Sequence, residues 1–540
     1  MIPRVLNTLD SHSPRCPWGS VFCRRKILLP RVMLVTSEAL PLAKTGGLGD
    51  AVSGLARALR DAHVDATVFM PAYESAMDAA CDLEEVAELP GLAGGDATVW
   101  AGWVADTEIP VLLLRNDRLY VRPGNPYLDA NGKEFPDNGI RFAALAQAAK
   151  RISVGETPIR VPHVVHAHDW HAGLTPLYLH AAGVKRPKTV LTIHNLAFQG
   201  NFPLHLADEL GIPPAYRGSE GAEFWGHLNF MKAGLRYADR LTTVSATYAR
   251  EILTPEFGHG LDGVLRERAH ELHAIPNGID TEVWDPSTDP FLPEHFSALD
   301  MRGKVRNKLE MQQAFGLPTD PEAPLLAMGS RLTSQKMADL AVEVFPRLLA
   351  AHPRLQIAVL GCGERAIEEA LRAVAERYPR NLGVHIGYDE RRGHLLHAGA
   401  DMLLHGSRFE PFGLTPLYSM LYGTVPIASR VGGLADSIVG LSPEPGAEVG
   451  SATGILFDGD TPDDMQKAVE RALDVFAQPQ KWSALQKNGM TTHFGWEASA
   501  AQYVELYRML APVAPVGAPM VARRPETASI PAATAVRKRA

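Results

Sequence analysis

Short runs of β-branched and other apolar residues alternate with helix-like patterns along most of the chain. This alternation restricts the fold more than any other feature, because it is typical of parallel sheets whose strands are joined by crossover helices. The runs form two series. The first has runs at residues 31–37, 67–70, 111–114, 163–166, 189–193 and 241–244, and the second at 325–328, 355–360, 384–386, 402–404, 425–428 and 454–457. We therefore predict an α/β fold with two doubly wound, Rossmann-like domains.

The length of 540 residues also favours two large domains over one. We place the first at residues 31–275 and the second at 276–494, and expect a helix at 495–510 that can pack on either of them. Residues 1–30 lack any strand or helix period, and their composition favours an extension without regular structure over a transit peptide. The Ala- and Pro-rich tail at 511–540 has the composition of a disordered segment.

Composition excludes several classes of protein. The net charge of −8 argues against a nucleic-acid partner. No apolar run is long enough to span a bilayer, so we expect no membrane partner. The four cysteines, Cys16, Cys23, Cys81 and Cys362, form no metal-binding or disulfide pattern. This pattern favours a reducing, cytoplasmic location.

A Gly-rich turn at residues 44–50 (KTGGLGD) follows the first predicted strand. Its glycines let the backbone approach a ligand closely, the helix that follows would attract an anion, and Lys44 adds a positive charge. Taken alone, such a turn is equally a tight turn with an exposed lysine. Residues 432–436 (GGLAD) repeat part of this motif, again where a strand gives way to a helix.

Two further motifs follow strands of the second series, at the sheet edge where open parallel sheets bind ligands. Arg331 and Lys336 lie in a turn from which both could reach a diphosphate, although a solvated helix start explains that motif equally well. The loop at 407–415 carries Glu410 before a helix start, where Leu414 and Thr415 would offer backbone N–H groups to an anion. Pro411 and Gly413 favour a shaped loop over a simple capping acid.

Histidines are concentrated at the ends of two strands of the first series. The spacing of His166, His168 and His171 does not match a zinc site, so we expect no metal there and interpret His166 as a satisfied, partly buried residue. A polar cluster for sugar hydroxyl groups explains the remaining residues better: Asp169, Trp170, His171, His194 and Asn195. Asp458 and Asp460 precede a helix start capped by Thr461, which favours capping over metal binding.

Together these motifs resemble the bacterial glycogen synthases and plant starch synthases, which are retaining glucosyltransferases of the two-domain GT-B architecture with a deep cleft. The resemblance extends from about residue 31 to residue 508. The motifs that carry it occur in the family's order: KTGGLGD, RPGNPY, HAHDWHAGL, TIHNLAFQG, NFMKAGLRYADRLTTVSATYAREI, PNGID, SRLTSQK, IGYDE and EPFGLTPLY.

The resemblance implies that the enzyme transfers glucose from ADP-glucose to the non-reducing end of an α-1,4-glucan primer, such as glycogen or a maltooligosaccharide. It implies donor-binding roles for Lys44, Gly47, Asp50, Asn277, Arg331, Lys336, Tyr388, Leu414 and Thr415. Among these, Tyr388 would stack on adenine. It also implies catalytic roles for Glu410, His194 and Lys44, and a sugar or acceptor region at Tyr127, Asp169, Trp170, His171 and Asn195.

The chemistry of glucosyl transfer suits these residue types. Breaking the anomeric bond builds positive charge on the sugar and negative charge on the diphosphate, which fixed cations and N–H groups stabilise. With enough cations no cofactor or divalent metal is expected. Since the sequence shows no clear second carboxylate beside the sugar, we favour front-face attack over double displacement.

Three residues depart from the family pattern: Phe412 replaces Cys, Pro416 replaces Gln and Met337 replaces Gly. They leave the charged groups intact but change the loops around them. Two other functions stay open: a related glucosyltransferase with a small acceptor, and an inactive glucan- or nucleotide-binding homologue. The long first-domain motifs oppose the former, and the complete set of Lys44, Arg331, Lys336 and Glu410 opposes the latter.

Overall fold

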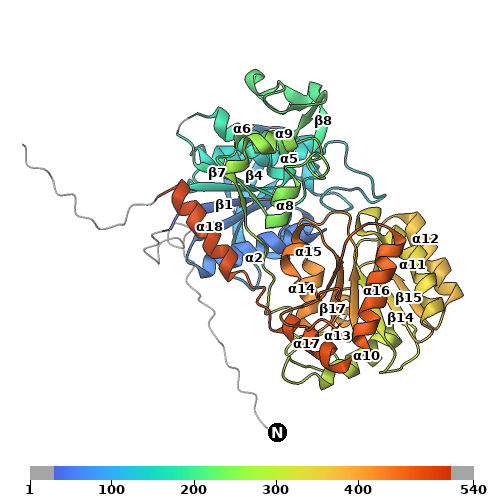
Figure 1. The fold of residues 1–540 in the computed structure, drawn as a ribbon. Helices are drawn as coiled ribbons and strands as arrows, with labels where there is room; N and C mark the ends of the chain where they lie inside the picture. The colour runs from blue at the N-terminus through green and yellow to red at the C-terminus, as the bar shows by residue number, and fades with distance from the viewer. Residues whose placement is uncertain (1–28, 184, 445, 513–540) are drawn as a thin grey trace, which may run out of the picture.

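The computed structural model describes residues 29–183, 185–444 and 446–512 (Figure 1). The predicted extension at residues 1–30 and the predicted tail at 511–540 therefore lie outside the described residues, apart from residues 29–30 and 511–512. Within the described part of the chain, no helix is long and apolar enough to cross a membrane.

The first half of the chain forms a nine-stranded sheet with the order β12-β11-β7-β6-β1-β2-β5-β4-β3. Its seven neighbouring strands from β12 to β5 are parallel, with Met33 of β1 opposite Thr67 of β2. The strands of this sheet are β1 (Arg31–Val35), β2 (Asp65–Pro71), β3 (Ala80–Leu92), β4 (Gly95–Val104), β5 (Pro110–Arg115), β6 (Val164–His168), β7 (Lys188–Ile193), β11 (Arg240–Thr243) and β12 (Leu272–Ala274). A small antiparallel sheet joins β8 (Asn201–Pro203), β10 (His227–Asn229) and β9 (Glu223–Phe224).

Helices connect these strands and pack on them with apolar faces. In α2, for example, Val52, Leu55 and Leu59 recur at helical spacing and are buried in the core of this half. The helices of this half are α2 (Gly47–Asp61), α3 (Glu74–Asp78), α4 (Asp117–Tyr120), α5 (Asn138–Ser153), α6 (Leu174–Ala181), α7 (Phe230–Tyr237), α8 (Ala246–Glu251) and α9 (Asp262–Glu267).

The second half forms a six-stranded, wholly parallel sheet with the order β15-β14-β13-β16-β17-β18. Its strands are β13 (Leu325–Gly329), β14 (Gln356–Gly361), β15 (Leu382–Ile386), β16 (Met402–His405), β17 (Val425–Ser429) and β18 (Ile455–Phe457). Its helices are α10 (Arg302–Ala314), α11 (Ala338–Ala351), α12 (Arg365–Arg377), α13 (Glu390–Gly399), α14 (Leu414–Leu421), α15 (Gly432–Ser437), α16 (Pro462–Phe476) and α17 (Pro479–Met490).

The prediction of two doubly wound α/β halves is confirmed, but the first sheet is not wholly parallel. The β3–β4 hairpin extends it antiparallel to β5. The sequence analysis did not predict this hairpin, because three register shifts interrupt its pairing and β3 exposes charged residues such as Glu84 and Glu85 at the sheet edge. A clean period of two residues is therefore missing.

The last helix, α18 (Glu497–Leu510), returns to the first half, and Figure 1 shows it in red beside the blue α2. Trp496 packs closely against two glycines. A Cβ atom at Gly54 would lie 2.1 Å from the indole Nε1 of Trp496, and a Cβ atom at Gly278 would lie 2.7 Å from Trp496 Cα. The hydroxyl of Tyr507 also bonds to His166, a residue of β6. The last helix therefore packs on the first half, and its start also contacts the segment that connects the two sheets.

Candidate active site

The predicted site residues lie where strands of the two parallel sheets end. Asp169 and His194 directly follow β6 and β7, whereas Arg331 and Glu410 follow β13 and β16. The two edges meet at the starts of α2 and α14, because a Cβ atom at Gly47 would lie 3.2 Å from Leu414 Cδ1. The candidate residues of the two halves therefore converge on one region.

Glu38 holds the Gly-rich turn in shape. Its carboxylate accepts hydrogen bonds from the backbone N–H groups of Thr45 at 2.5 Å and Gly46 at 3.2 Å, and from Thr45 Oγ1 at 2.6 Å. The hydroxyl of Tyr127 donates to the same carboxylate. Sequence reasoning missed Glu38, which is 2% exposed, because nothing in the local sequence shows that it folds back on a turn seven residues later.

Lys44 and Asp50 form an ion pair with an N–O distance of 2.8 Å. Both belong to the Gly-rich motif, Lys44 before α2 and Asp50 in its first turn. The pair keeps the ammonium at the helix start, where the macrodipole also favours an anion. Its predicted role beside a phosphate is compatible with this position, since an ammonium has three donors and Asp50 uses one.

Glu410 is 7% exposed and is surrounded by donors. The Lys336 ammonium contacts its carboxylate, His405 Nε2 lies 3.1 Å away and Ser407 Oγ donates at 3.0 Å, all to Oε2. Burial alone would raise the pKa of Glu410, but Lys336 and His405 outweigh it and hold the pKa well below its usual range. Glu410 is therefore ionised at neutral pH.

The Glu410 cluster also contains a group that the sequence analysis overlooked. His405 is the last residue of β16, one position beyond the predicted run 402–404. Burial and the Lys336 ammonium lower the pKa of His405, so it faces Glu410 as a neutral donor. The predicted partnership of Lys336 with Arg331 is less direct than we expected: Lys336 is buried against Glu410, whereas Arg331 is exposed and donates to Gln335 at 3.0 Å.

The three departures from the family pattern surround this cluster. Met337 ends the 3₁₀ turn at Ser334–Lys336 with φ 51°, in the left-handed region that favours glycine, yet its side chain is buried. Pro416 stands in the first turn of α14 and removes one of the N–H groups that face an anion. Phe412 packs beside Gly433. Leu414 and Thr415 are the first two residues of α14, so they lie at the helix start as predicted.

Three histidines line the edge of the first sheet. His166 is fully buried and both ring nitrogens are bonded, to Tyr507 at 2.7 Å and to Thr192 at 2.5 Å, so it is more buried than the sequence suggested. His168 Nδ1 lies 3.0 Å from His194 Nε2. Burial lowers the pKa of His194, so this histidine is neutral near pH 7. Among the described residues, no group of His, Cys, Asp and Glu has the arrangement of a metal site.

Asp169 positions the loop that carries His194. Its carboxylate accepts hydrogen bonds from the backbone N–H groups of His194 at 2.7 Å and Asn195 at 3.2 Å. Burial raises the pKa of Asp169 to about 7, against the effect of these two bonds. The residue itself has φ 55°, which a tight turn after β6 imposes on it. One oxygen of Asp169 is thus committed to the backbone of the loop.

The other predicted sugar-binding residues form an aromatic group. The His171 ring stacks on Tyr127 at 4.6 Å and lies 4.0 Å from the Trp170 ring. Trp170 packs onward against Phe142 and Phe202, and a Cβ atom at Gly200 would lie 2.3 Å from its ring. The structure therefore brings Tyr127, Trp170 and His171 together, with Trp170 packed on its far side by apolar rings.

Tyr388 is 78% exposed in the turn between β15 and α13. Partial burial raises its pKa, while the charges of Lys44, Glu390 and Asp50 also act on its hydroxyl. Two of these charges, Lys44 and Asp50, belong to the Gly-rich motif of the opposite half. Asn277 lies on the segment between the two sheets, next to Gly278, where the Trp496 backbone approaches closely.

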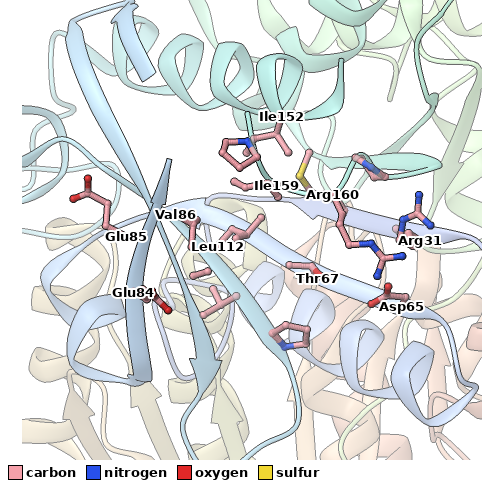
Figure 2. A pocket seen from close by; sticks show the side chains of 17 residues that line it. Arg31, Asp65, Thr67, Glu84, Glu85, Val86, Leu112, Ile152, Ile159 and Arg160 are labelled. Atoms are coloured by element: carbon pink, nitrogen blue, oxygen red, sulfur yellow. The ribbon is translucent and has the colours of Figure 1, made fainter. Parts of the chain in front are cut away.

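A separate cavity of about 540 Å³ lies away from these residues. Figure 2 shows it lined by Arg31, Asp65, Thr67, Val86 and Leu112, with Ile152 and Ile159 above. Arg31 and Asp65 begin β1 and β2, so the cavity opens at the amino ends of the strands. Since ligands of open α/β sheets bind at the carboxyl ends, this cavity is not the candidate active site.

Comparison with known families finds a match for each half of the chain. Residues 31–267 match the family described as starch synthase catalytic domain, and residues 311–488 match the family described as glycosyl transferases group 1. A glycogen synthase from Bordetella petrii is 56% identical over 481 residues, covering 88% of this chain and 91% of the relative. A glycogen synthase from Ralstonia nicotianae is 56% identical over 482 residues, covering 89% of this chain and 88% of the relative.

Solved structures show the same architecture. The catalytic domain of starch synthase IV from Arabidopsis thaliana, bound to ADP and acarbose, matches with a TM-score of 0.80 at 28% identity, covering 89% of this chain and 99% of that chain. A sucrose-phosphate synthase from Thermosynechococcus elongatus matches with a TM-score of 0.55 at 18% identity, covering 89% and 99%, which shows a shared fold alone.

Proposed function

The chain belongs to the glycogen and starch synthase family, and from this premise we propose that it transfers glucose from ADP-glucose to the non-reducing end of an α-1,4-glucan with retention of configuration. The enzyme class itself, a glucosyltransferase of the glycogen synthase type, follows from the family. The donor, the stereochemistry and the roles of individual residues form the proposal.

The observation that carries the proposal is the buried Lys336–Glu410 pair beside the start of α14, opposite the Gly-rich turn of α2. Lys336, Arg331 and Lys44 would balance the charge that develops on the diphosphate, together with the first N–H groups of α14. Glu410, held ionised, would accept hydrogen bonds from hydroxyl groups of the transferred glucose. These cations support our expectation that turnover needs no divalent metal.

The attacking group is the 4-hydroxyl at the non-reducing end of the glucan. Its oxygen forms a bond to the anomeric carbon while the bond from that carbon to the diphosphate breaks, and the hydroxyl proton passes to the departing phosphate oxygen. Attack from the same face gives retention without a protein nucleophile. In favour of this route, Glu410 is already bonded to Lys336, and Asp169 to two backbone N–H groups. Neutral His194 would lie near the anomeric carbon.

Two features support ADP-glucose as the donor. The exposed ring of Tyr388 lies near the Gly-rich turn, where it offers a purine more stacking area than a pyrimidine. The starch synthase with a TM-score of 0.80 was solved with ADP and acarbose. The same ligands suggest that the acceptor region here, at Tyr127, Asp169, Trp170, His171 and Asn195, takes a glucan. The scattered cysteines remain our reason to place the enzyme in the cytoplasm.

The donor assignment is tested by measuring kcat/KM for ADP-glucose and UDP-glucose with one glycogen primer, in wild type and in Tyr388→Ala. We expect wild type to favour ADP-glucose and Tyr388→Ala to lose up to about five-fold of that preference, since one stacking contact contributes about 1 kcal/mol. Equal use of UDP-glucose by wild type would refute the donor assignment. An unchanged ratio in Tyr388→Ala would refute only the stacking role.

A further inference from the structure

The motif at residues 432–436 repeats the Gly-rich turn in sequence but serves a different purpose in the structure. At Gly46 a Cβ atom would meet nothing within 4 Å, so that turn is open. At Gly432, with φ 42°, a Cβ atom would lie 1.9 Å from the backbone oxygen of Glu410. The second motif is therefore packed directly against the loop that carries Glu410.

The backbone N–H groups of this motif are already bonded. Gly432 N donates to Glu251 Oε1 at 2.9 Å, and Gly433 N donates to the Glu410 backbone oxygen at 3.0 Å. A phosphate-binding turn needs free N–H groups. The resemblance to the first motif consequently does not indicate a second phosphate site.

Asp436, the last residue of the motif, reaches across to the first half of the chain. Its Oδ2 accepts from Ser245 Oγ at 2.6 Å and from Thr247 N at 2.9 Å, and its Oδ1 accepts from Thr247 Oγ1 at 2.6 Å. Ser245 caps α8 and Thr247 lies in its first turn. Each helix thus contributes one carboxylate that accepts hydrogen bonds from the other: Glu251 of α8 accepts from α15, and Asp436 of α15 accepts from the start of α8.

The helix α8 also contacts the loop that carries His194. Tyr248, which is 1% exposed, accepts a hydrogen bond from Leu196 N at 3.0 Å through its hydroxyl. Burial raises the pKa of Tyr248, and the charges of Asp169, Glu251 and Glu410 add to this rise. One short helix therefore contacts the segment after β7 and the motif after β17, which in turn packs against the Glu410 loop.

We infer that Ser245, Thr247, Glu251, Gly432 and Asp436 form an interdomain latch that sets the Glu410 loop against the His194 loop. Glu251 and Asp436 act as positioning residues in this latch, since neither contacts a substrate in the arrangement described above. The inference rests on the proposed roles of Glu410 and His194. Loss of the latch would leave each half folded but would lower the fraction of molecules in which the two loops face each other.

The test compares Asp436→Ala with Asp436→Asn. The alanine removes all three hydrogen bonds. The asparagine can keep them, because its carbonyl oxygen accepts from Ser245 and Thr247 N while its amide donates to Thr247 Oγ1. Asp463→Ala is the matched control, since it removes an ion pair of 2.9 Å to Arg347 within the second half alone. Thr247→Val removes one of the three bonds to Asp436, together with the bond from Arg250 to Thr247 Oγ1 within α8, and serves if Asp436→Ala does not fold.

Two readouts separate positioning from stability. The first is kcat and KM for ADP-glucose with glycogen. The second, which needs no turnover, is the distance between spin labels at Cys81 and at Leu299→Cys in the presence of ADP, with Cys16, Cys23 and Cys362 replaced by serine. Both label positions are exposed and they lie in different halves.

We expect Asp436→Ala to lower kcat on the order of 10- to 100-fold and to broaden the label distances, because each lost bond shifts an equilibrium by up to about ten-fold. Asp436→Asn and Asp463→Ala should match wild type in both readouts, and Thr247→Val should lie between. Equal losses in the alanine and asparagine variants, or an unchanged distance distribution in Asp436→Ala, would overturn the latch. Failure of wild type to use ADP-glucose would instead contradict the proposed donor, and the distance test would then use the nucleoside diphosphate of the donor that wild type does use.

Discussion

Replacing Lys336 by glutamine removes the ammonium that faces Glu410 inside the site. Lys336 and Glu410 side chains are 11% and 9% exposed, so solvent cannot replace the lost partner. Breaking such a buried pair costs about 3–5 kcal/mol, of which a hydrogen bond from the glutamine amide restores about 1 kcal/mol. We therefore expect Lys336→Gln to lower the free energy of unfolding by about 2–4 kcal/mol at pH 7.

Proton uptake by Glu410 sets an upper limit on this loss and makes it depend on pH. Protonating a carboxyl group with an ordinary pKa of about 4.3 costs about 3.7 kcal/mol at pH 7 but only about 1 kcal/mol at pH 5. In wild type the pKa of Glu410 is lowered, so the stability it contributes is retained down to pH 5 and lost only at lower pH. In Lys336→Gln the bonds from His405 and Ser407 remain, but the ammonium is lost; we expect burial then to raise that pKa above its unfolded value, so the variant should gain stability as pH falls.

The assay is urea unfolding of wild type and Lys336→Gln at pH 7 and pH 5, with Arg347→Gln as a control. Arg347 forms an exposed pair with Asp463, so its loss should cost less than about 1 kcal/mol at either pH. The difference between wild type and Lys336→Gln should shrink to about 1 kcal/mol at pH 5. An equal difference at both pH values would refute the argument that Lys336 keeps Glu410 ionised. The variant should also lose kcat/KM for ADP-glucose and keep its affinity for glycogen.

Substitutions at two other positions test the parts around this pair. Met337→Gly relieves left-handed strain of about 1–2 kcal/mol but truncates a buried side chain at about 2–5 kcal/mol, so its free energy of unfolding should fall by about 1–3 kcal/mol. Met337→Ala keeps the strain and should be about 1 kcal/mol less stable than the glycine variant in urea unfolding; the reverse order would contradict the strain argument. Glu38→Ala leaves Thr45 N, Gly46 N and the Tyr127 hydroxyl without their acceptor. Its KM for ADP-glucose should rise by about ten-fold, in line with one lost charge-assisted bond, and an unchanged KM would show that the turn does not depend on Glu38.

The sequence predicted the position of candidate residues at a sheet edge where they follow a buried strand within a few residues. Glu410 and His194 are examples, because an apolar run ends shortly before each and the edge of a parallel sheet is where ligands bind. The helix start at α16 also matched the prediction: Thr461 caps it and forms a capping box with Asp464. Local patterns are sufficient for such features, since the interacting atoms lie within a few residues of each other.

Contacts between distant segments could not be predicted in this way. Lys336 and Glu410 are 74 positions apart, and Ser245 and Asp436 are 191 positions apart. The sequence marked Lys336 as a phosphate ligand and residues 432–436 as an echo of the Gly-rich turn, but which side chain each of them faces depends on contacts between segments that are distant in the chain. The role of Glu38 was hidden for the same reason, since Tyr127 lies 89 positions away.

The most direct test of the central claim is the transfer of radiolabelled glucose from ADP-glucose to glycogen by wild type and by Glu410→Gln. We predict incorporation by wild type, resistant to EDTA, and a rate for the folded variant lower on the order of a hundred-fold or more, as for other losses of a preorganised site group. When the labelled glycogen is then treated with an enzyme that removes glucose units from non-reducing ends, the label should be released. Near-normal incorporation by folded Glu410→Gln would contradict the account of this site.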